Sequence, residues 1–187
     1  MRADLPGFSS PDTGTEAPLE LMAACHVRIQ HHGELLKRLD AQLRTRDADE
    51  QARGAAQCIL RYFDTAMPDH HRDEERDLFP ALLETMAGSD PVCIREMIVG
   101  LTEEHRDLET QWALMREAVA RIAAGETAAL DSAAVASFCD LSVHHLRRED
   151  DELLPMAARL LGDHEIEAIG QAMRRRRAIP EQPGARA

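Results

Sequence analysis

Residues 70–80 read His-His-Arg-Asp-Glu-Glu-Arg-Asp-Leu-Phe-Pro, and residues 145–155 read His-Leu-Arg-Arg-Glu-Asp-Asp-Glu-Leu-Leu-Pro. The two stretches align without a gap, and the alignment pairs His70 with His145 and Glu74 with Glu149. A spacing of four places each His and its Glu about one turn apart on one face of a helix, where both can reach a single ion. Imidazole and carboxylate donors without a thiolate suit iron, and manganese or zinc less specifically. The repeat therefore predicts two halves of a metal site.

The composition of the 187-residue chain predicts an all-α protein with one domain. Aromatic residues make up only 3%, whereas Ala, Leu, Arg and Glu are abundant, which favours helices over sheets. The net charge of −12 argues against nucleic acid or an anionic membrane surface as a partner. Because the sequence has no secretion signal and no stretch of about 18 apolar residues, we expect a soluble cytoplasmic protein. Four cysteines stand singly and are expected to be reduced thiols: Cys25, Cys58, Cys93 and Cys139.

Two charged runs are expected to face solvent. The basic run, Arg174–Arg177, is expected to be the solvated end of a last helix, where cations complement the helix dipole, rather than a nucleic-acid contact. The acidic run lies within the repeat and is expected to form a solvated face; it consists of Glu75, Asp77, Asp150, Asp151 and Glu152.

Apolar residues at helical spacing predict four long helices. They are expected from residue 18 to about 45, from Asp47 to about 86, from an Asp90-Pro91 start to Gly125, and from about Asp131 to Gly162. Pro80 is expected to bend the second helix rather than end it, because the apolar pattern resumes beyond it. Short connections favour an up-down-up-down four-helix bundle over residues 18–162. Residues 1–17 are expected to be a flexible lead-in, and residues 163–187 a short fifth helix with a disordered basic tail.

A histidine interrupts the apolar stripe of each long helix. His70 lies about 17 residues before the second helix ends, His105 about 15 residues after the third begins, and His145 about 16 residues before the fourth ends. Because the helices alternate in direction and rise 1.5 Å per residue, these three histidines fall at nearly the same level of the bundle. His26 needs only to share that level on the first helix. Four imidazoles and the two repeat glutamates would then form one layer, and two carboxylates that span it suit two bridged ions rather than one.

With these motifs the sequence resembles the hemerythrin-like, or HHE cation-binding, family, as a bacterial stand-alone member, over residues 18–160. The matching motifs are Cys25-His26-Val27-Arg28-Ile29, the two repeat stretches, and Glu104-His105-Arg106. The resemblance implies a non-haem di-iron centre in a four-helix bundle. It also implies that two glutamates bridge the iron ions and that four histidines are terminal ligands; these are Glu74 and Glu149, and His26, His70, His105 and His145.

The sequence departs from the oxygen-carrying hemerythrins in two places. The third helix of those proteins carries His-x-x-x-His, whereas this chain has His105-x-x-x-Glu109. Their fourth helix has an aspartate five residues after its histidine, whereas here Glu149 follows His145 by four residues. The oxygen-carrier role therefore does not follow from the resemblance. His71 is a candidate fifth imidazole ligand, since some family members use an adjacent second ligand there. Glu109 is a candidate terminal ligand or, alternatively, a carboxylate that orients a ligand histidine.

Three functions are compatible with these features. The leading hypothesis is a metal-binding protein whose carboxylate-bridged di-iron centre binds a diatomic gas, oxygen or nitric oxide, for sensing or protection. The alternative is a di-iron enzyme that reduces nitric oxide or peroxide, or an iron donor for iron–sulfur cluster repair. Family members of the repair class usually carry an additional N-terminal cysteine-bearing domain, which these 187 residues do not contain. The third hypothesis is a metal-free helical interaction module.

Overall fold

The computed structural model describes residues 18–85 and 92–177, and within these ranges every regular element is a helix. The first long helix is α1 (Pro18–Leu43). The second consists of α2 (Glu50–Arg61), η1 (Tyr62–Ala66), α3 (Met67–Asp73), η2 (Glu74–Leu78) and α4 (Phe79–Thr85), where η marks a π-helical turn. The third is α5 (Val92–Ala123). The fourth consists of α6 (Ser132–Arg148), η3 (Glu149–Leu153) and α7 (Leu154–Leu160), and it is followed by α8 (Asp163–Arg176).

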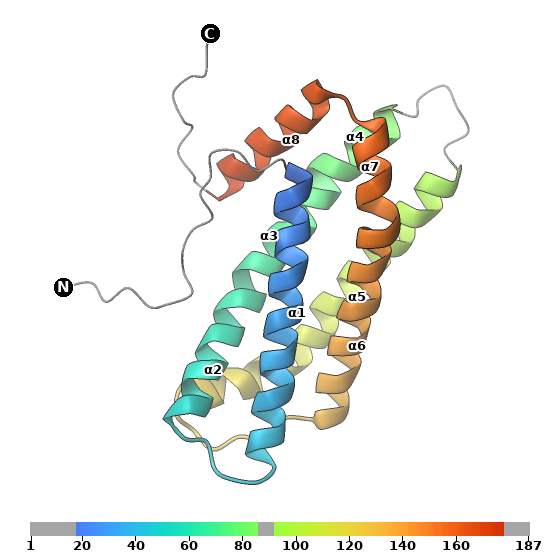
Figure 1. The fold of residues 1–187 in the computed structure, drawn as a ribbon. Coiled ribbons are helices and arrows are strands. Elements are labelled where there is room, and N and C mark those ends of the chain that lie inside the picture. Colours follow the sequence, from blue (N-terminus) through green and yellow to red (C-terminus); the bar gives the residue numbers. More distant parts are fainter. Residues whose placement is uncertain (1–17, 86–91, 178–187) are drawn as a thin grey trace, which may run out of the picture.

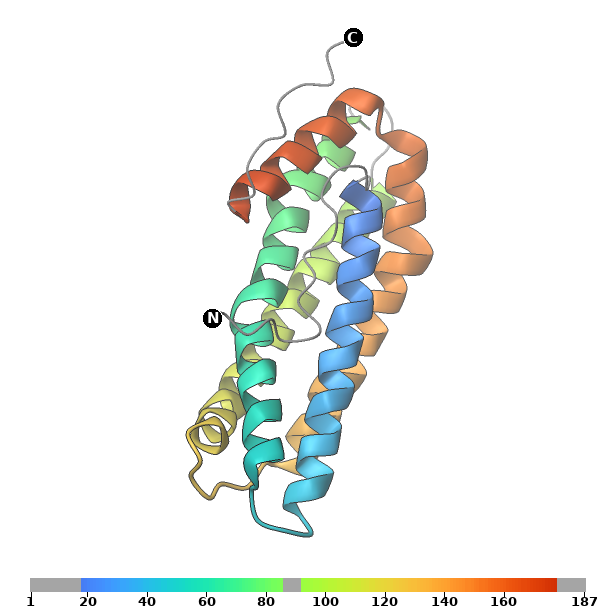
Figure 2. The same cartoon turned by 60° about the vertical axis from the view of Figure 1, so that its left-hand side comes forward.

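The four long helices form an up-down-up-down bundle, which confirms the predicted fold class (Figure 1). α1 packs against α2 and α6, and α5 packs against the same two helices, so α1 and α5 occupy opposite corners. α8 lies across the end of the bundle at which α1 begins, where it contacts α1, α3 and η2 (Figure 2). No helix within the described ranges is long and apolar enough to cross a membrane.

The helix ends follow from local side-chain chemistry. Asp49 caps α2 by accepting the N–H of Ala52 at 2.8 Å, so the cap lies two residues later than the sequence predicted. Asp131 caps α6 at the predicted position through two backbone N–H groups. Gly125 follows α5 with a φ of 86°, a left-handed conformation that favours glycine. The predicted Asp90 start of the third helix lies outside the described residues.

Each π-helical turn ends two residues before a proline. η1 precedes Pro68, η2 precedes Pro80 and η3 precedes Pro155. Within an α-helix a proline lacks the N–H for the i→i−4 bond, and its ring clashes with the carbonyl of residue i−4. In all three cases that carbonyl lies in the π-helical turn, whose wider i→i−5 bonding makes room for the ring. The second long helix therefore continues past Pro80 to Thr85, as predicted.

Two apolar clusters fill the bundle, one on each side of a buried polar layer. Along α1 the layer residue is His26, and along α5 it is His105. Because the layer lies between the two clusters, it is enclosed by apolar side chains at both ends. The cluster on the α8 side includes Met22, Leu78, Leu101 and Leu153, and the cluster on the other side includes Ile29, Met67, Leu108 and Phe138.

Candidate metal centre

The polar layer gathers seven of the eight predicted ligands from all four long helices. α1, α5 and α6 each contribute one histidine, α3 contributes two, and a glutamate stands at the first position of both η2 and η3. Each of these residues is between 0 and 2% exposed. Burial of so many polar groups is costly unless a partner compensates them. The seven are His26, His70, His71, Glu74, His105, His145 and Glu149.

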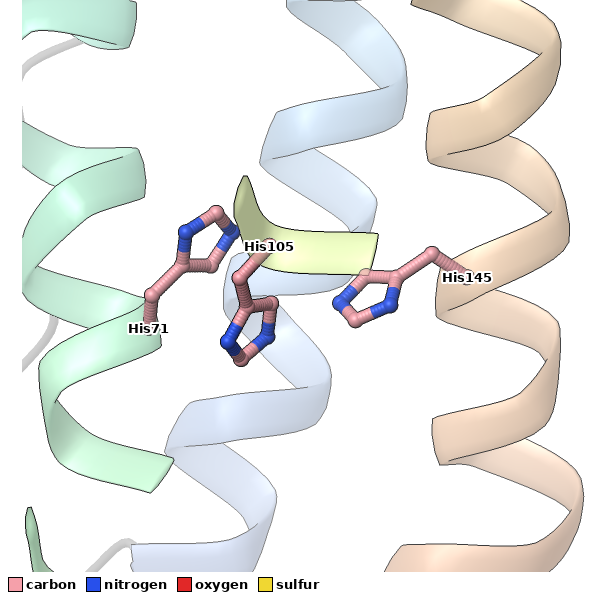
Figure 3. Close-up of side chains that lie close together, drawn as sticks. All are labelled: His71, His105 and His145. Atoms are coloured by element: carbon pink, nitrogen blue, oxygen red, sulfur yellow. The ribbon is translucent and has the colours of Figure 1, made fainter. Parts of the chain in front are cut away.

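The histidine donor atoms of the layer form two groups, and two histidines of each group lie with the same two glutamates. One donor atom from each histidine lies within 4.8 Å of its neighbours in the group. Figure 3 shows the three rings of the larger group converging from α3, α5 and α6. The two-histidine group consists of His26 and His70, which lie with both Glu74 and Glu149. The three-histidine group consists of His71, His105 and His145, and of these His105 and His145 lie with the same two glutamates.

Each shared glutamate turns one oxygen to each group. Oε1 of Glu74 lies 3.5 Å from Nε2 of His70, and its Oε2 lies 3.2 Å from Nε2 of His105. Oε2 of Glu149 lies 3.2 Å from Nε2 of His26, and its Oε1 lies 2.9 Å from Nε2 of His145. This is the arrangement that two carboxylates would need to bridge two ions.

Three further carboxylates hold the outward nitrogens of the histidines. An ionised carboxylate only accepts hydrogen bonds, so the Nδ1 facing it must carry the proton. The Nε2 lone pair of each ring then faces the layer, in the state that binds a metal. The Nδ1 groups of His105, His145 and His26 donate to Glu75 at 2.8 Å, to Glu104 at 2.8 Å and to Asp150 at 2.6 Å, respectively.

The expectation of a solvated acidic face was wrong for Glu75, which is 23% exposed, whereas Asp150 is 42% exposed as expected and also accepts a hydrogen bond from His26. Each directly follows a shared glutamate, and a step of about 100° around the helix turns it towards a histidine of a neighbouring helix. This role does not follow from the helical spacing of Glu75 and Asp150, and neither does the role of Glu104, which directly precedes His105. The one signal available was this adjacency to a predicted ligand. The partners themselves are far apart in the chain, 124 positions in the case of His26 and Asp150.

His71 and Glu109, the two candidates whose roles the sequence left open, lie in different places. His71 lies inside the layer, where its ring stacks on that of His105 with 3.9 Å between the centroids. Glu109 lies outside both donor groups, and its side chain is 43% exposed. Its Oε1 is 3.9 Å from Nδ1 of His71 and 3.1 Å from a guanidinium nitrogen of Arg106. This position resembles that of a carboxylate that orients a ligand histidine more than that of a ligand.

The shared carboxylates control the charge of the imidazoles. Burial alone would lower the pKa of His70 and His105, but the carboxylates of Glu74 and Glu149 outweigh it and raise these pKa values to about 9 and about 10. Burial lowers the pKa of His71 to about 3, and neighbouring histidines add to the effect. Burial acts to raise the pKa of Glu149, but the nearby imidazoles hold it well below its usual value. Without a metal, protons therefore supply the positive charge that the layer requires.

The unpaired atoms of the layer fit a pair of cations. Among residues 18–85 and 92–177, none of these inward-facing atoms has a partner in hydrogen-bond geometry, although the atoms lie close together and are fully buried. Native proteins leave few buried polar atoms without a partner, so such a concentration needs an explanation. Nitrogen and carboxylate oxygen are suitable ligands for divalent first-row metals. The unpaired atoms include both oxygens of Glu74 and Glu149 and the Nε2 atoms of His26, His70, His105 and His145.

A sequence model of the hemerythrin HHE cation-binding domain matches residues 17–157, about three quarters of the chain. The chain belongs to this family. It is also similar to an uncharacterized protein of Haemophilus influenzae, with 26% identity over 164 residues that cover 88% of this chain and 92% of that protein. The HHE family assignment agrees with the resemblance that the repeat motifs predicted, and it supports cation binding by the buried layer.

The basic run Arg174–Arg177 was expected to be solvated, but its last two residues form ion pairs with the bundle. Arg176 donates to Asp77 at 2.7 Å and to Asp73, and Arg177 also pairs with Asp73, which is fully buried. These ion pairs tie the end of α8 to α3 and η2, which carry three of the candidate ligands. Three other histidines, His31, His144 and His164, are exposed, whereas the ring of His32 stacks on that of Tyr62.

Proposed function

We propose that this protein binds two metal ions, iron in the cell, bridged by Glu74 and Glu149, and that the pair binds a diatomic gas, oxygen or nitric oxide, for sensing or protection. The observation that carries the proposal is the division of each glutamate between two groups of imidazoles. One ion would be held by the two-histidine group and the other by the three-histidine group. The same donors would accept manganese or zinc less specifically.

The chain's own residues fix what can reach the pair. The layer is enclosed by apolar clusters on both sides, and its side chains are at most 2% exposed. Such an enclosure favours a small uncharged ligand over a bulky or ionic substrate. The two-histidine group brings one imidazole fewer than its neighbour, so it leaves more room for an added ligand. When bound, iron would supply the affinity for a diatomic gas.

Purification without oxygen, elemental analysis and optical spectra before and after addition of oxygen or nitric oxide test this proposal. We expect two iron ions per chain and a spectral change that reverses when the gas is removed. His145→Ala should lose iron, and the matched control His144→Ala, at an exposed neighbouring position, should retain it. One ion or fewer per chain at saturating iron would overturn the proposal. Steady consumption of nitric oxide or peroxide would instead favour the enzyme.

A further inference from the structure

The three-histidine group is held in place more firmly than the two-histidine group. Two of its imidazoles, those of His105 and His145, donate to Glu75 and Glu104. These two carboxylates are only 23% and 16% exposed. An arginine holds each of them in turn, since Arg106 pairs with Glu75 and Arg148 pairs with Glu104. Carboxylates fixed in this way orient ligand imidazoles and increase their basicity.

The two-histidine group has only one such support. His26 donates to Asp150, which is 42% exposed and has no second hydrogen-bond or ion-pair partner within the described part of the chain. Within the described residues, His70 has no hydrogen-bond partner at Nδ1, although it is 99% buried, whereas Nδ1 of His71, which is also unbonded, has Oε1 of Glu109 at 3.9 Å. An imidazole that binds a metal through Nε2 carries its proton at Nδ1, so metal binding by His70 leaves a buried donor unsatisfied. That lowers the affinity for the ion.

The shared glutamates add to the difference. Whichever ion binds first neutralises part of the charge of Glu74 and Glu149, because each glutamate turns one oxygen to each group. The second ion then meets less negative charge and the repulsion of a first divalent cation close by. The position with the firmer supports, that of His105 and His145, takes the first ion.

We infer that the position formed by His26 and His70 is an exchangeable metal position, which a divalent first-row cation fills second and leaves first, while the three-histidine position retains its ion. The inference rests on the proposed two-ion centre. Loss of outer hydrogen-bond partners typically costs 10- to 100-fold in metal affinity, so the two affinities should differ by at least about tenfold. The protein then has a stable one-ion state, and it can accept or hand over one ion without emptying the layer.

Titration of the metal-free protein with Co²⁺, in competition with a chromophoric chelator, tests the inference. Wild-type protein should bind one equivalent tightly and a second at least about tenfold more weakly. Asp150→Asn should weaken only the second step, and Glu104→Gln only the first. The exposed neighbours provide matched controls, because Asp151→Asn and Glu103→Gln should change neither step. Melting curves of all variants show whether each is folded.

Release kinetics provide a second measurement that needs no variant. When excess chelator is added to protein loaded with two Co²⁺ ions, one equivalent should leave at least several times faster than the other. Two ions that bind in a single step and leave at one rate would overturn the inference and keep the two-ion centre. Weakening of the first step by Asp150→Asn would also overturn it. Failure to bind any Co²⁺ or Fe²⁺ would instead overturn the proposed function.

Discussion

At Glu74 and Glu75 the chain turns two adjacent carboxylates in different directions. Glu74 lies in the buried layer, and Glu75 reaches the Nδ1 of His105 from outside it. Glu149 and Asp150 repeat this division in the fourth long helix, where Asp150 supports His26 on α1. One residue in each pair thus faces the candidate ions, and the next residue orients a histidine of a neighbouring helix.

The different positions of the adjacent glutamates predict different losses on substitution. Glu74→Ala should remove most of the bound iron, because it deletes an oxygen from both donor groups. Glu75→Gln should keep two ions at saturation but lower the affinity about 10- to 100-fold, the usual effect of losing a support for a ligand histidine. Elemental analysis measures the number of bound ions, and competition with a chelator measures the affinity. Loss of iron in Glu75→Gln with retention in Glu74→Ala would move the site by one residue.

Spacing placed His70, Glu74, His105, His145 and Glu149 together, whereas His71 came from the family resemblance and the supporting carboxylates could not be predicted. The four-residue interval between His70 and Glu74 depends only on the helical repeat, which is the same in every helix. The pairing of His26 with Asp150 depends on how two helices are rotated against each other, and no spacing within one helix contains that information. For the same reason the sequence left the role of Glu109 open, between ligand and orienting carboxylate.

Among the helices, two of the three π-helical turns begin at a candidate ligand. η2 begins at Glu74 and η3 begins at Glu149, so each shared glutamate stands where the helix changes its bonding. π-helical turns inside α-helices are frequent at functional sites. The apolar stripes predicted these helices as continuous because a single turn hardly disturbs the pattern. The available signal was a proline at a fixed distance after each turn, at Pro80 and Pro155.

The ion pairs at the end of α8 are predicted to stabilise the bundle. Asp73 is fully buried, and its partners are Arg176 and Arg177. The double variant Arg176→Ala/Arg177→Ala should cost about 3 kcal/mol, because it leaves a buried carboxylate without a counter-charge. Adding Asp73→Asn should recover part of this loss, since it removes the unpaired charge.

Urea unfolding measures these differences in the free energy of unfolding. Arg175→Ala is the matched control, because this side chain is exposed on the same helix and should change the free energy by less than about 0.5 kcal/mol. Equal stability of wild type and the double variant would mean that α8 is not anchored through Asp73.

At the scale of the whole molecule, protons and metal ions are alternative sources of positive charge for one layer. Without metal, His70 and His105 have pKa values of about 9 and about 10, above the 6.5 of an unfolded chain. Their contribution to stability is therefore fully present below about pH 6.5 and is lost as the pH rises through 9 and 10. Metal binding instead requires neutral imidazoles, so ions are lost as the pH falls below about 6.

The two forms should consequently show opposite pH dependences. The melting temperature of the chelated protein should fall between pH 7 and 9.5, and that of the metal-loaded protein should rise between pH 5.5 and 7.5. At pH 7.5 the loaded form should be the more stable, by about 4 kcal/mol when free metal is a thousand times its dissociation constant. Circular dichroism melts with and without chelator check this. A chelated protein that becomes more stable from pH 7 to 9.5 would contradict the account.

An anomalous-difference map of crystals loaded with iron, recorded above and below the iron absorption edge, tests the claim that Glu74 and Glu149 bridge two ions. We predict two peaks per chain, about 3.5–4 Å apart as in other two-metal sites, one beside His26 and His70 and the other beside His71, His105 and His145. Each peak should contact one oxygen from each shared glutamate, and Glu109 should contact neither. A single peak, or two peaks that do not share Glu74 and Glu149, would contradict the claim.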